Sequence, residues 1–189
     1  HLFLFFVVLD TMKHLTVLTM FLLAVLPVSA QTCPDGNHPH AIDLGLRSGT
    51  KWACCNVGAS SPTAYGGYYE PGEAGDAAGS EWGGQWRIPT KAQFQELRDT
   101  CSSEWTTVDG VGGLRFTGPN GRSVFLPAAG GRNSISLYDA GSVGDYWSGT
   151  PAEGSTDNAY RLLFHPGDVF VSYFNHRRYD GHSVRPVMP

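Results

Sequence analysis

Asn158-Ala-Tyr-Arg-Leu-Leu-Phe164 begins the stretch that decides the fold of this chain. The stretch continues with His165-Pro166-Gly167 and ends with Asp168-Val-Phe-Val-Ser-Tyr173. Pro followed by Gly suits the two central positions of a type II turn, so the two flanking runs predict a β-hairpin. Alternate residues of a strand share a face, and Leu162, Phe164, Val169 and Val171 can therefore be buried together. The other face is predicted to display Arg161, Leu163, His165, Asp168, Phe170 and Ser172.

The run Tyr173-Phe-Asn-His-Arg-Arg-Tyr-Asp180 continues the displayed face. It is too aromatic for an ordinary loop and too polar for a core. Exposed Tyr, Arg, His and Asn are the residue types that recognition surfaces use. The alternative is a loop that packs Tyr173 or Phe174 on the core. We predict a binding surface that also includes Tyr173, Asn175, His176, Arg178, Tyr179, Asp180 and His182.

Residues 1–30 have the pattern of an export signal. Met12-Lys13-His14 is a basic start, residues 15–26 are apolar, and Pro27-Val-Ser-Ala30 offers small residues to a signal peptidase. We predict that residues 12–30 are a signal peptide and that residues 1–11, upstream of Met12, are untranslated or leader residues. The alternative is a membrane anchor over residues 1–26, which Asp10 and Lys13 disfavour because each charge is costly at mid-bilayer depth.

The remaining residues, 31–189, have the length of a single domain with a sizeable core. The net charge of the chain is -4, and its one basic cluster, Arg177-Arg178, sits among Tyr, His and Asp. A nucleic-acid partner would need a basic patch, so we expect none. No later apolar run is long enough to span a membrane. The protein is thus expected to be secreted or held at the cell surface, with no membrane span once the signal is removed.

Export makes the four cysteines candidates for disulfides rather than metal ligands. Adjacent Cys54 and Cys55 point to opposite faces of a strand, so they would have different partners. We predict the pairs Cys55–Cys101 and Cys33–Cys54, with free buried thiols as the alternative for the second pair.

The rest of the chain predicts short strands and one helix. Strands are expected over residues 41–46 and 51–57, which form an opening hairpin, and over residues 104–108, 113–117, 122–126 and 146–149. Residues 91–101 are predicted to be helical, because Thr90 and Gln93 form a capping box and Phe94 and Leu97 share a helical face. Two Gly-rich segments, residues 58–84 and 127–145, are expected to be irregular.

Five segments resemble the family called the Fibrobacter succinogenes major paralogous domain, which is common in secreted and surface proteins of Bacteroides-type gut bacteria. Within one of them, Arg87-Ile-Pro-Thr90 before a helix is similar to formylglycine-generating enzymes. The resemblance implies an α+β, C-type lectin-like domain with short antiparallel strands, one or two helices, long Gly-rich loops, and both termini in one sheet. The segments are Ile42 to Gly58, Trp82 to Thr90, Phe125 to Gly130, Tyr146 to Ser148 and Ser183 to Val187.

The chain departs from the functional members of that fold. No cysteine follows Cys101, where the oxidising enzymes carry reactive ones, and Glu70-Pro71-Gly72 lacks the third oxygen ligand of the calcium-dependent sugar binders. His38 and His40 have no third ligand at a plausible spacing. We therefore expect no metal and no other cofactor.

A catalytic alternative would need carboxylates near a histidine. Glu70, Glu73 and Asp76 lie in one segment and could serve glycoside hydrolysis if a cleft brought them near His165 or His176. No Gly-x-Ser-x-Gly motif frames a serine nucleophile. We therefore expect the protein not to be an enzyme.

The C-terminal part also lacks certain residue types. Lys, Glu, Gln, Met and Trp are absent from residues 157–187, whereas residues 31–156 contain seventeen of them, a rate at which about four would be expected in the later stretch. Codons that end in C cannot encode these five types. This pattern resembles the variable proteins of diversity-generating retroelements, whose adenines in AAC codons are mutated, and the resemblance implies that the hairpin is diversified.

Taken together, these patterns favour a secreted or surface-displayed ligand-binding module for a protein or glycan. Its ligand would be held on the face of the C-terminal hairpin. The alternatives are a degenerate or unrecognised glycan-active enzyme and a structural surface or fimbrial component.

Overall fold

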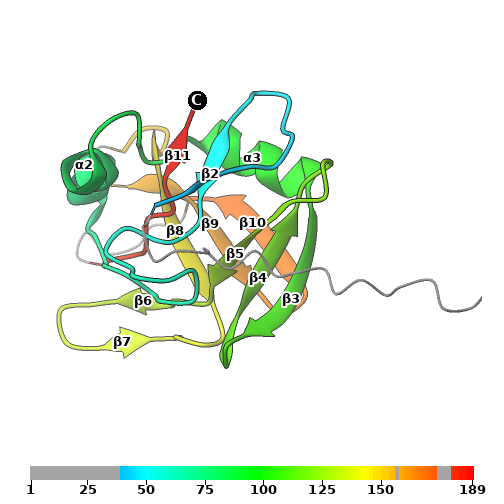
Figure 1. The fold of residues 1–189 in the computed structure, drawn as a ribbon. Coiled ribbons are helices and arrows are strands. Elements are labelled where there is room, and N and C mark those ends of the chain that lie inside the picture. The colour runs from blue at the N-terminus through cyan, green and yellow to red at the C-terminus, as the bar shows by residue number, and fades with distance from the viewer. Residues whose placement is uncertain (1–38, 156–157, 174–179) are drawn as a thin grey trace, which may run out of the picture. The chain divides into compact units, whose positions relative to one another are not determined.

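The computed structural model describes residues 39–155, 158–173 and 180–189, which belong to one compact unit, Gln31–Pro189. These residues form small antiparallel sheets and two helices, joined by loops (Figure 1). The predicted α+β class is therefore confirmed. The predictions for residues 1–30 and for Cys33 lie outside the described residues.

Neither helix in the described residues has the length and apolar character needed to cross a membrane.

The first sheet joins the two ends of the described chain. Strands β1 (Ala41–Asp43) and β2 (Lys51–Ala53) form the predicted opening hairpin, and β11 (Val187–Met188) pairs antiparallel with β2 (Figure 1). Trp52 is fully buried at the centre of this sheet, opposite Val187, and its ring lies 5.6 Å from that of Phe94. The strands are shorter than predicted, but the hairpin is confirmed.

The second sheet is a meander of β3 (Ser102–Val108), β4 (Val111–Thr117) and β5 (Ser123–Pro127). Asp109 and Gly110 connect the first two strands with φ angles of 49° and 81°. Two residues with positive φ form the turn whose twist matches that of paired strands, and Asp-Gly is a favoured sequence for it. The predicted strands of this region are confirmed.

The third sheet contains the C-terminal hairpin, in the order β10-β9-β8. Its strands are β8 (Gly144–Pro151), β9 (Ala159–His165) and β10 (Asp168–Ser172). Gly167 in the connecting turn has φ 105°, as a residue at the third position of the predicted turn requires. The predicted hairpin is confirmed.

The register of the hairpin sorts its side chains into two faces. Leu163 lies opposite Phe170, and the neighbouring directly opposed pairs are His165 with Asp168 and Arg161 with Ser172. Directly opposed residues share a face, so the six residues predicted to share one do so. Leu162 and Phe164, on the other face, are fully buried.

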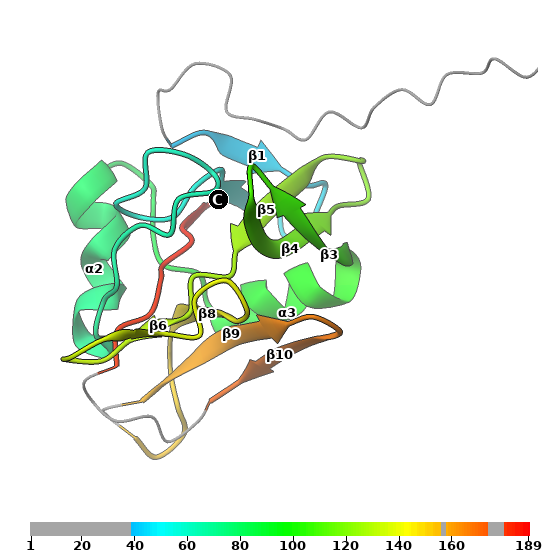
Figure 2. The same ribbon diagram turned by 90° about the horizontal axis from the view of Figure 1, so that it is seen from below.

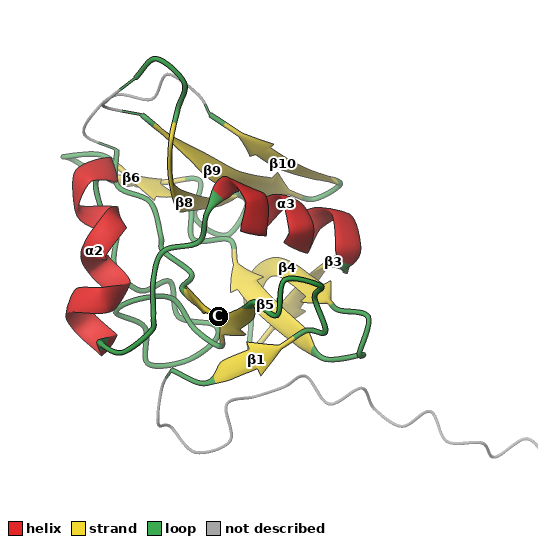
Figure 3. Ribbon diagram, turned by 90° about the horizontal axis from the view of Figure 1, so that it is seen from above, coloured by secondary structure: helices red, strands yellow, loops and turns green. Residues whose placement is uncertain are grey.

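Helix α3 (Lys91–Thr100) packs against β8, β9 and β10 (Figure 3). The predicted capping box is present: the Gln93 backbone N–H donates to Thr90 Oγ1 at 3.3 Å, and the Thr90 N–H donates to Gln93 Oε1 at 2.9 Å. Phe94 and Leu97 are fully buried, as their spacing predicts.

A second helix, α2 (Pro71–Trp82), lies in the segment predicted to be irregular (Figure 3). Its buried face consists of Ala74, Ala77 and Ala78, which are spaced as on one side of a helix and pack in a cluster with Trp147 and Val184. The helical spacing of the alanines was missed in the sequence because glycine, which is frequent in this segment, disfavours helices. The prediction of an irregular segment is wrong for these residues.

The segment predicted as the second Gly-rich loop contains a small hairpin. Strands β6 (Gly131–Arg132) and β7 (Leu137–Tyr138) pair antiparallel. Gly130 has φ 66°, and a Cβ there would lie 2.1 Å from the Tyr138 carbonyl oxygen, so only glycine fits this close approach. The alternation in two-residue strands is too brief to be detected in sequence.

The predicted Cys55–Cys101 disulfide is absent. Cys101 ends helix α3 as a free thiol and packs with Cys55 in one apolar cluster. Burial, and to a lesser degree Glu96, raises the pKa of the Cys101 thiol to about 11, which disfavours the reactive thiolate. Both cysteines therefore serve as small hydrophobic core residues here. The predicted Cys33–Cys54 pair involves a residue outside the described ones.

We expect Cys101 in the folded protein to resist alkylation at pH 8. A pKa of about 11 instead of the ordinary 9.0 leaves roughly 100-fold less thiolate at that pH. The protein is treated with iodoacetamide in the absence of reductant, once in its folded state and once in urea. Peptide mapping of both samples measures the reactivity of Cys101. We expect Cys101 to be modified only in the urea sample. A Cys101 that stays unmodified in urea would show that it forms a disulfide.

Candidate ligand-binding site

A pocket of about 240 Å³ lies between the β6–β7 hairpin and β9. Figure 2 shows β6 alongside the sheet that contains β8 and β9. Three residues of the predicted binding face, Arg161, Leu163 and His165, line it. Part of the predicted site therefore lies in a pocket. The remaining lining residues are Gly130, Gly131, Tyr138, Asp139, Val143 and Asp145.

A buried ion pair forms the inner end of this pocket. The Arg161 Nη1 donates to Asp145 Oδ2, and the two residues are only 5% and 4% exposed. Asp145 reaches this position because it lies opposite Leu163 in the pairing of β8 with β9, two residue pairs away from Arg161 and on the same face of the sheet. The prediction of an exposed Arg161 is therefore wrong, since β8 supplies a carboxylate that covers it.

The carboxyl group of Asp145 has an unusual protonation equilibrium. Burial raises its pKa, and the nearby negative charge of Asp180 adds to this, while the charge and hydrogen bond of Arg161 lower it, so that the pKa is about 7. His182 Nδ1 also lies 3.7 Å from Asp145 Oδ2. A buried, perturbed carboxyl beside a pocket marks a candidate functional site.

The predicted ligand contacts Asp180 and His182 are buried instead of exposed. The segment that carries them is held between other elements by backbone bridges, from Gly181 to Arg132 and from His182 to Tyr69. A third bridge, from Ser183 to Tyr146, fixes the segment beside β8. Asp180 and His182 can therefore influence Asp145, but they do not belong to the outer surface.

Three buried polar atoms at the pocket have no hydrogen-bond partner among the described residues. They are Tyr138 Oη, Asp145 Oδ1 and Arg161 Nε. Leaving a buried polar atom unpaired costs about 1–3 kcal/mol, so such atoms in folded proteins usually face water or a ligand. All three atoms are enclosed by protein, so the accessible lining of the pocket comes from other atoms of these residues.

The outer part of the predicted face continues from the pocket along the hairpin. Asp168 and Phe170 are exposed, Ser172 is half-buried, and the rings of His165 and Phe170 lie 6.0 Å apart. Phe170 is 43% exposed, an unusual position for a phenylalanine side chain. His165 thus links the pocket to the exposed ring of Phe170.

Tyr173 lies on the opposite side of the hairpin from Phe170. Its ring packs edge-on against Tyr160, at 5.2 Å, and Lys91 Nζ lies 3.8 Å from the centre of the Tyr160 ring. Tyr173 is 49% exposed but does not share a face with the pocket. The other predicted contacts, Asn175, His176, Arg178 and Tyr179, lie outside the described residues.

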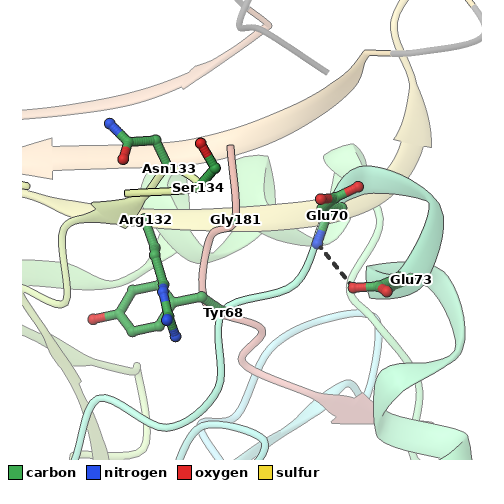
Figure 4. A pocket seen from close by; sticks show the side chains of 7 residues that line it. All are labelled: Tyr68, Glu70, Glu73, Arg132, Asn133, Ser134 and Gly181. Atoms are coloured by element: carbon green, nitrogen blue, oxygen red, sulfur yellow. Dashed lines mark hydrogen bonds between the residues drawn. The ribbon is translucent and has the colours of Figure 1, made fainter. Parts of the chain in front are cut away.

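A second pocket, of about 290 Å³, contains two of the carboxylates considered for glycoside hydrolysis. Figure 4 shows Glu70 and Glu73 on one side of it and Arg132 on another. Glu73 Oε2 accepts a weak bond, 3.4 Å long, from the Glu70 backbone N–H at the start of α2. His165 lines the first pocket and not this one, so the described residues do not bring these carboxylates to that histidine.

The predicted site did not include three polar side chains that line the first pocket, those of Tyr138, Asp139 and Asp145. A sequence signal existed for Asp145, because it directly precedes the apolar strand segment that begins at Tyr146. A carboxylate at the edge of a buried strand needs a cationic partner. No comparable signal marked Tyr138, because the β6–β7 hairpin itself was not predicted.

Comparison with protein-family models, with curated proteins and with solved structures found no match to this chain. The family resemblances drawn from its motifs therefore stay predictions.

Proposed function

We propose that this protein is a secreted or surface-displayed module that binds a protein or glycan ligand. The ligand is held by the pocket beside Arg161 and by the open face around Phe170. The observation that carries the proposal is a cavity lined by Arg161, Leu163 and His165, with the exposed ring of Phe170 beside it on the same face of the hairpin. A preformed cavity with apolar walls and a few polar side chains is typical of binding sites.

Binding without catalysis is the simplest use of this arrangement. Phe170 and His165 provide aromatic contact area, and recognition surfaces depend on such rings. The rigid sheet behind them keeps the surface preorganised, which lowers the entropic cost of binding. We include the C-type lectin-like fold in the proposal, supported by the pairing of the opening hairpin with the C-terminal strand β11.

The proposal is tested by probing glycan arrays and cell-surface protein arrays with the purified protein. A variant carrying His165→Ala and Phe170→Ala should lose the strongest signals by about tenfold or more, as the removal of central aromatic contacts does. The matched control is Tyr173→Ala, which removes a similarly exposed ring from the opposite face and should keep them. Full binding by the double variant, or no binding by the parent protein on either array, would contradict the proposal.

We extend the proposal to diversification of the hairpin. The stretch that lacks five residue types, residues 157–187, contains β9 and β10 and thus the whole displayed face. Core residues such as Leu162 and Phe164 would stay constant while the alternate positions vary. Sequencing the surrounding gene locus should reveal a near-identical copy that differs only at adenines, beside a reverse transcriptase. A locus without such a copy would remove this extension.

A further inference from the structure

Strand β10 has one long edge that no other described strand pairs with. The order β10-β9-β8 places it at the outside of its sheet, and Figure 2 shows no labelled strand on its outer side. His165 and Asp168 pair directly across the Pro-Gly turn, so they exchange backbone hydrogen bonds. Hydrogen-bonded pairs alternate along an antiparallel ladder, so the backbone N–H and C=O groups of Val169 and Val171 point away from β9. None of the backbone hydrogen bonds found between described elements reaches these groups, and β10 therefore has an open strand edge.

Edge strands in natural proteins usually carry features that prevent pairing with another chain, such as shortness, a charge, proline or a bulge. Among the described edge strands, β1 and β11 have only three and two residues, and β3 carries Glu104 in its interior. Strand β10 has five residues without proline, and its register with β9 is continuous. Its one charged residue, Asp168, lies at the end beside the turn. The central residues of β10 thus lack these protections.

The sequence of β10 is complementary to itself in an antiparallel pair. A two-fold axis at Phe170 places Val169 of one copy opposite Val171 of the other copy, so that their outward backbone groups exchange hydrogen bonds. The same register places Asp168 opposite Ser172, which avoids two like charges that face each other. All five residues of the strand are paired in this register.

The ring of Phe170 is covered in this arrangement. Phe170 lies opposite its own copy in a non-hydrogen-bonded pair, where the two Cα atoms are about 4.5 Å apart and the side chains are closest. Its side chain is 43% exposed in the single chain, so the pairing removes apolar surface from water. Aromatic pairs at such positions stabilise antiparallel strands. A register shifted by two residues places the ring opposite Asp168 or Ser172 instead and leaves part of the strand unpaired.

We propose that two copies of this protein associate through β10 and join their third sheets into one continuous sheet. A second copy is favoured over an unrelated strand, because β10 matches itself in length, charge and side-chain type. Directly opposed residues share a face, so the displayed faces of both copies lie on the same side of the joined sheet. This inference does not depend on the proposed ligand binding, since the pocket is lined by β9 and not by β10.

Sedimentation velocity of the purified protein over a range of concentrations tests the inference. We expect a monomer–dimer equilibrium with a Kd on the order of 10 µM, because a strand edge of this length is a small interface. Val171→Pro removes an outward N–H, and edge strands tolerate proline at such positions. This variant should dimerise at least about tenfold more weakly, because the two-fold axis removes the hydrogen bond twice. Circular dichroism in urea checks that it is folded.

A charge exchange at position 170 tests the register independently of the proline variant. Phe170→Lys and Phe170→Glu each place like charges opposite each other, so each variant alone should associate more weakly than the parent protein. An equimolar mixture should associate about fivefold or more tightly than either variant alone, because unlike charges then face each other. The matched controls are Tyr173→Lys and Tyr173→Glu. Tyr173 is similarly exposed, at 49%, but lies on the opposite face, so each control should dimerise alone as the parent protein does.

The inference is overturned if the parent protein stays monomeric up to about 500 µM, far above the expected Kd. It is also overturned if folded Val171→Pro dimerises with the affinity of the parent protein, or if the mixture of Phe170→Lys and Phe170→Glu associates no better than its components. Ligand binding on the arrays does not require the dimer. The proposed function would therefore stand after any of these results.

Discussion

Replacing Arg161 by Ala is expected to lower the free energy of unfolding by about 3–5 kcal/mol at pH 9, where Asp145, with its pKa of about 7, is ionised in the parent protein and would be left buried without its partner. Both residues are about 95% buried, so water cannot replace the lost contact without local opening. Urea denaturation followed by circular dichroism measures this loss as a lower midpoint at an unchanged slope.

The double variant Arg161→Met with Asp145→Leu is the control for this prediction. Apolar side chains of similar size avoid an unpaired charge, and such replacements of buried ion pairs are often neutral or stabilising. The double variant should therefore recover most of the stability that Arg161→Ala loses. An Arg161→Ala protein as stable as the parent would show that the ion pair is solvated instead of buried.

Replacing Phe164 by Ala is expected to cost about 3–5 kcal/mol of stability, the range for removing a fully buried phenylalanine. The Phe164 ring stacks on Tyr146 at 5.8 Å and meets Trp105 edge-on at 6.4 Å. It also covers Gly144, where a Cβ would lie 2.0 Å from the ring. The neighbouring elements are thus fitted to this side chain and cannot collapse fully into the space it would leave.

Phe170→Ala is the matched control, because the same substitution is made six residues later on the opposite face of the same hairpin. Phe170 is 43% exposed, so its loss should cost about 1 kcal/mol or less. Urea unfolding of both variants, with binding measured in parallel, separates a stability residue from a ligand residue. Similar stability losses for the two variants would contradict the assignment of the faces.

The hairpin could be predicted from sequence because its information is local. A Pro-Gly turn and two alternating runs determine which residues pair and which share a face. Alternation does not reveal what covers a face, however. Arg161 is buried because Asp145, sixteen residues earlier, reaches it from the neighbouring strand, a contact that no local pattern encodes.

The errors in the predicted site have similar physical origins. Tyr173 follows Ser172 directly, so the strand period already assigned it to the other face, but the composition of the run suggested a continuous surface. The burial of Asp180 and His182 depends on bridges to Arg132 and Tyr69, which lie far away in the chain. Such long-range pairings decide exposure and are visible only in three dimensions.

Helix α2 and the β6–β7 hairpin both lie in Gly-rich segments and were not predicted from the sequence. Helix α2 follows a regular alanine spacing, but its glycines lower the local helix propensity, and its stability comes from packing its small buried face on a tertiary cluster. The β6–β7 hairpin has strands of two residues, so its geometry depends on close approaches such as that of Gly130 to Tyr138. Both elements position the candidate pockets, which is why the sequence indicated a binding face but not a cavity.

Hydrogen–deuterium exchange of the complex with the strongest array ligand tests most directly whether the pocket beside Arg161 and the face around Phe170 form the binding site. We expect the ligand to slow exchange in peptides that cover Gly130 to Tyr138 and Tyr160 to Phe170, while peptides of α2 exchange as before. Protection confined to Glu70, Glu73 and the start of α2, with the C-terminal hairpin unaffected, would place the ligand in the second pocket and contradict the assignment of the binding site to the hairpin.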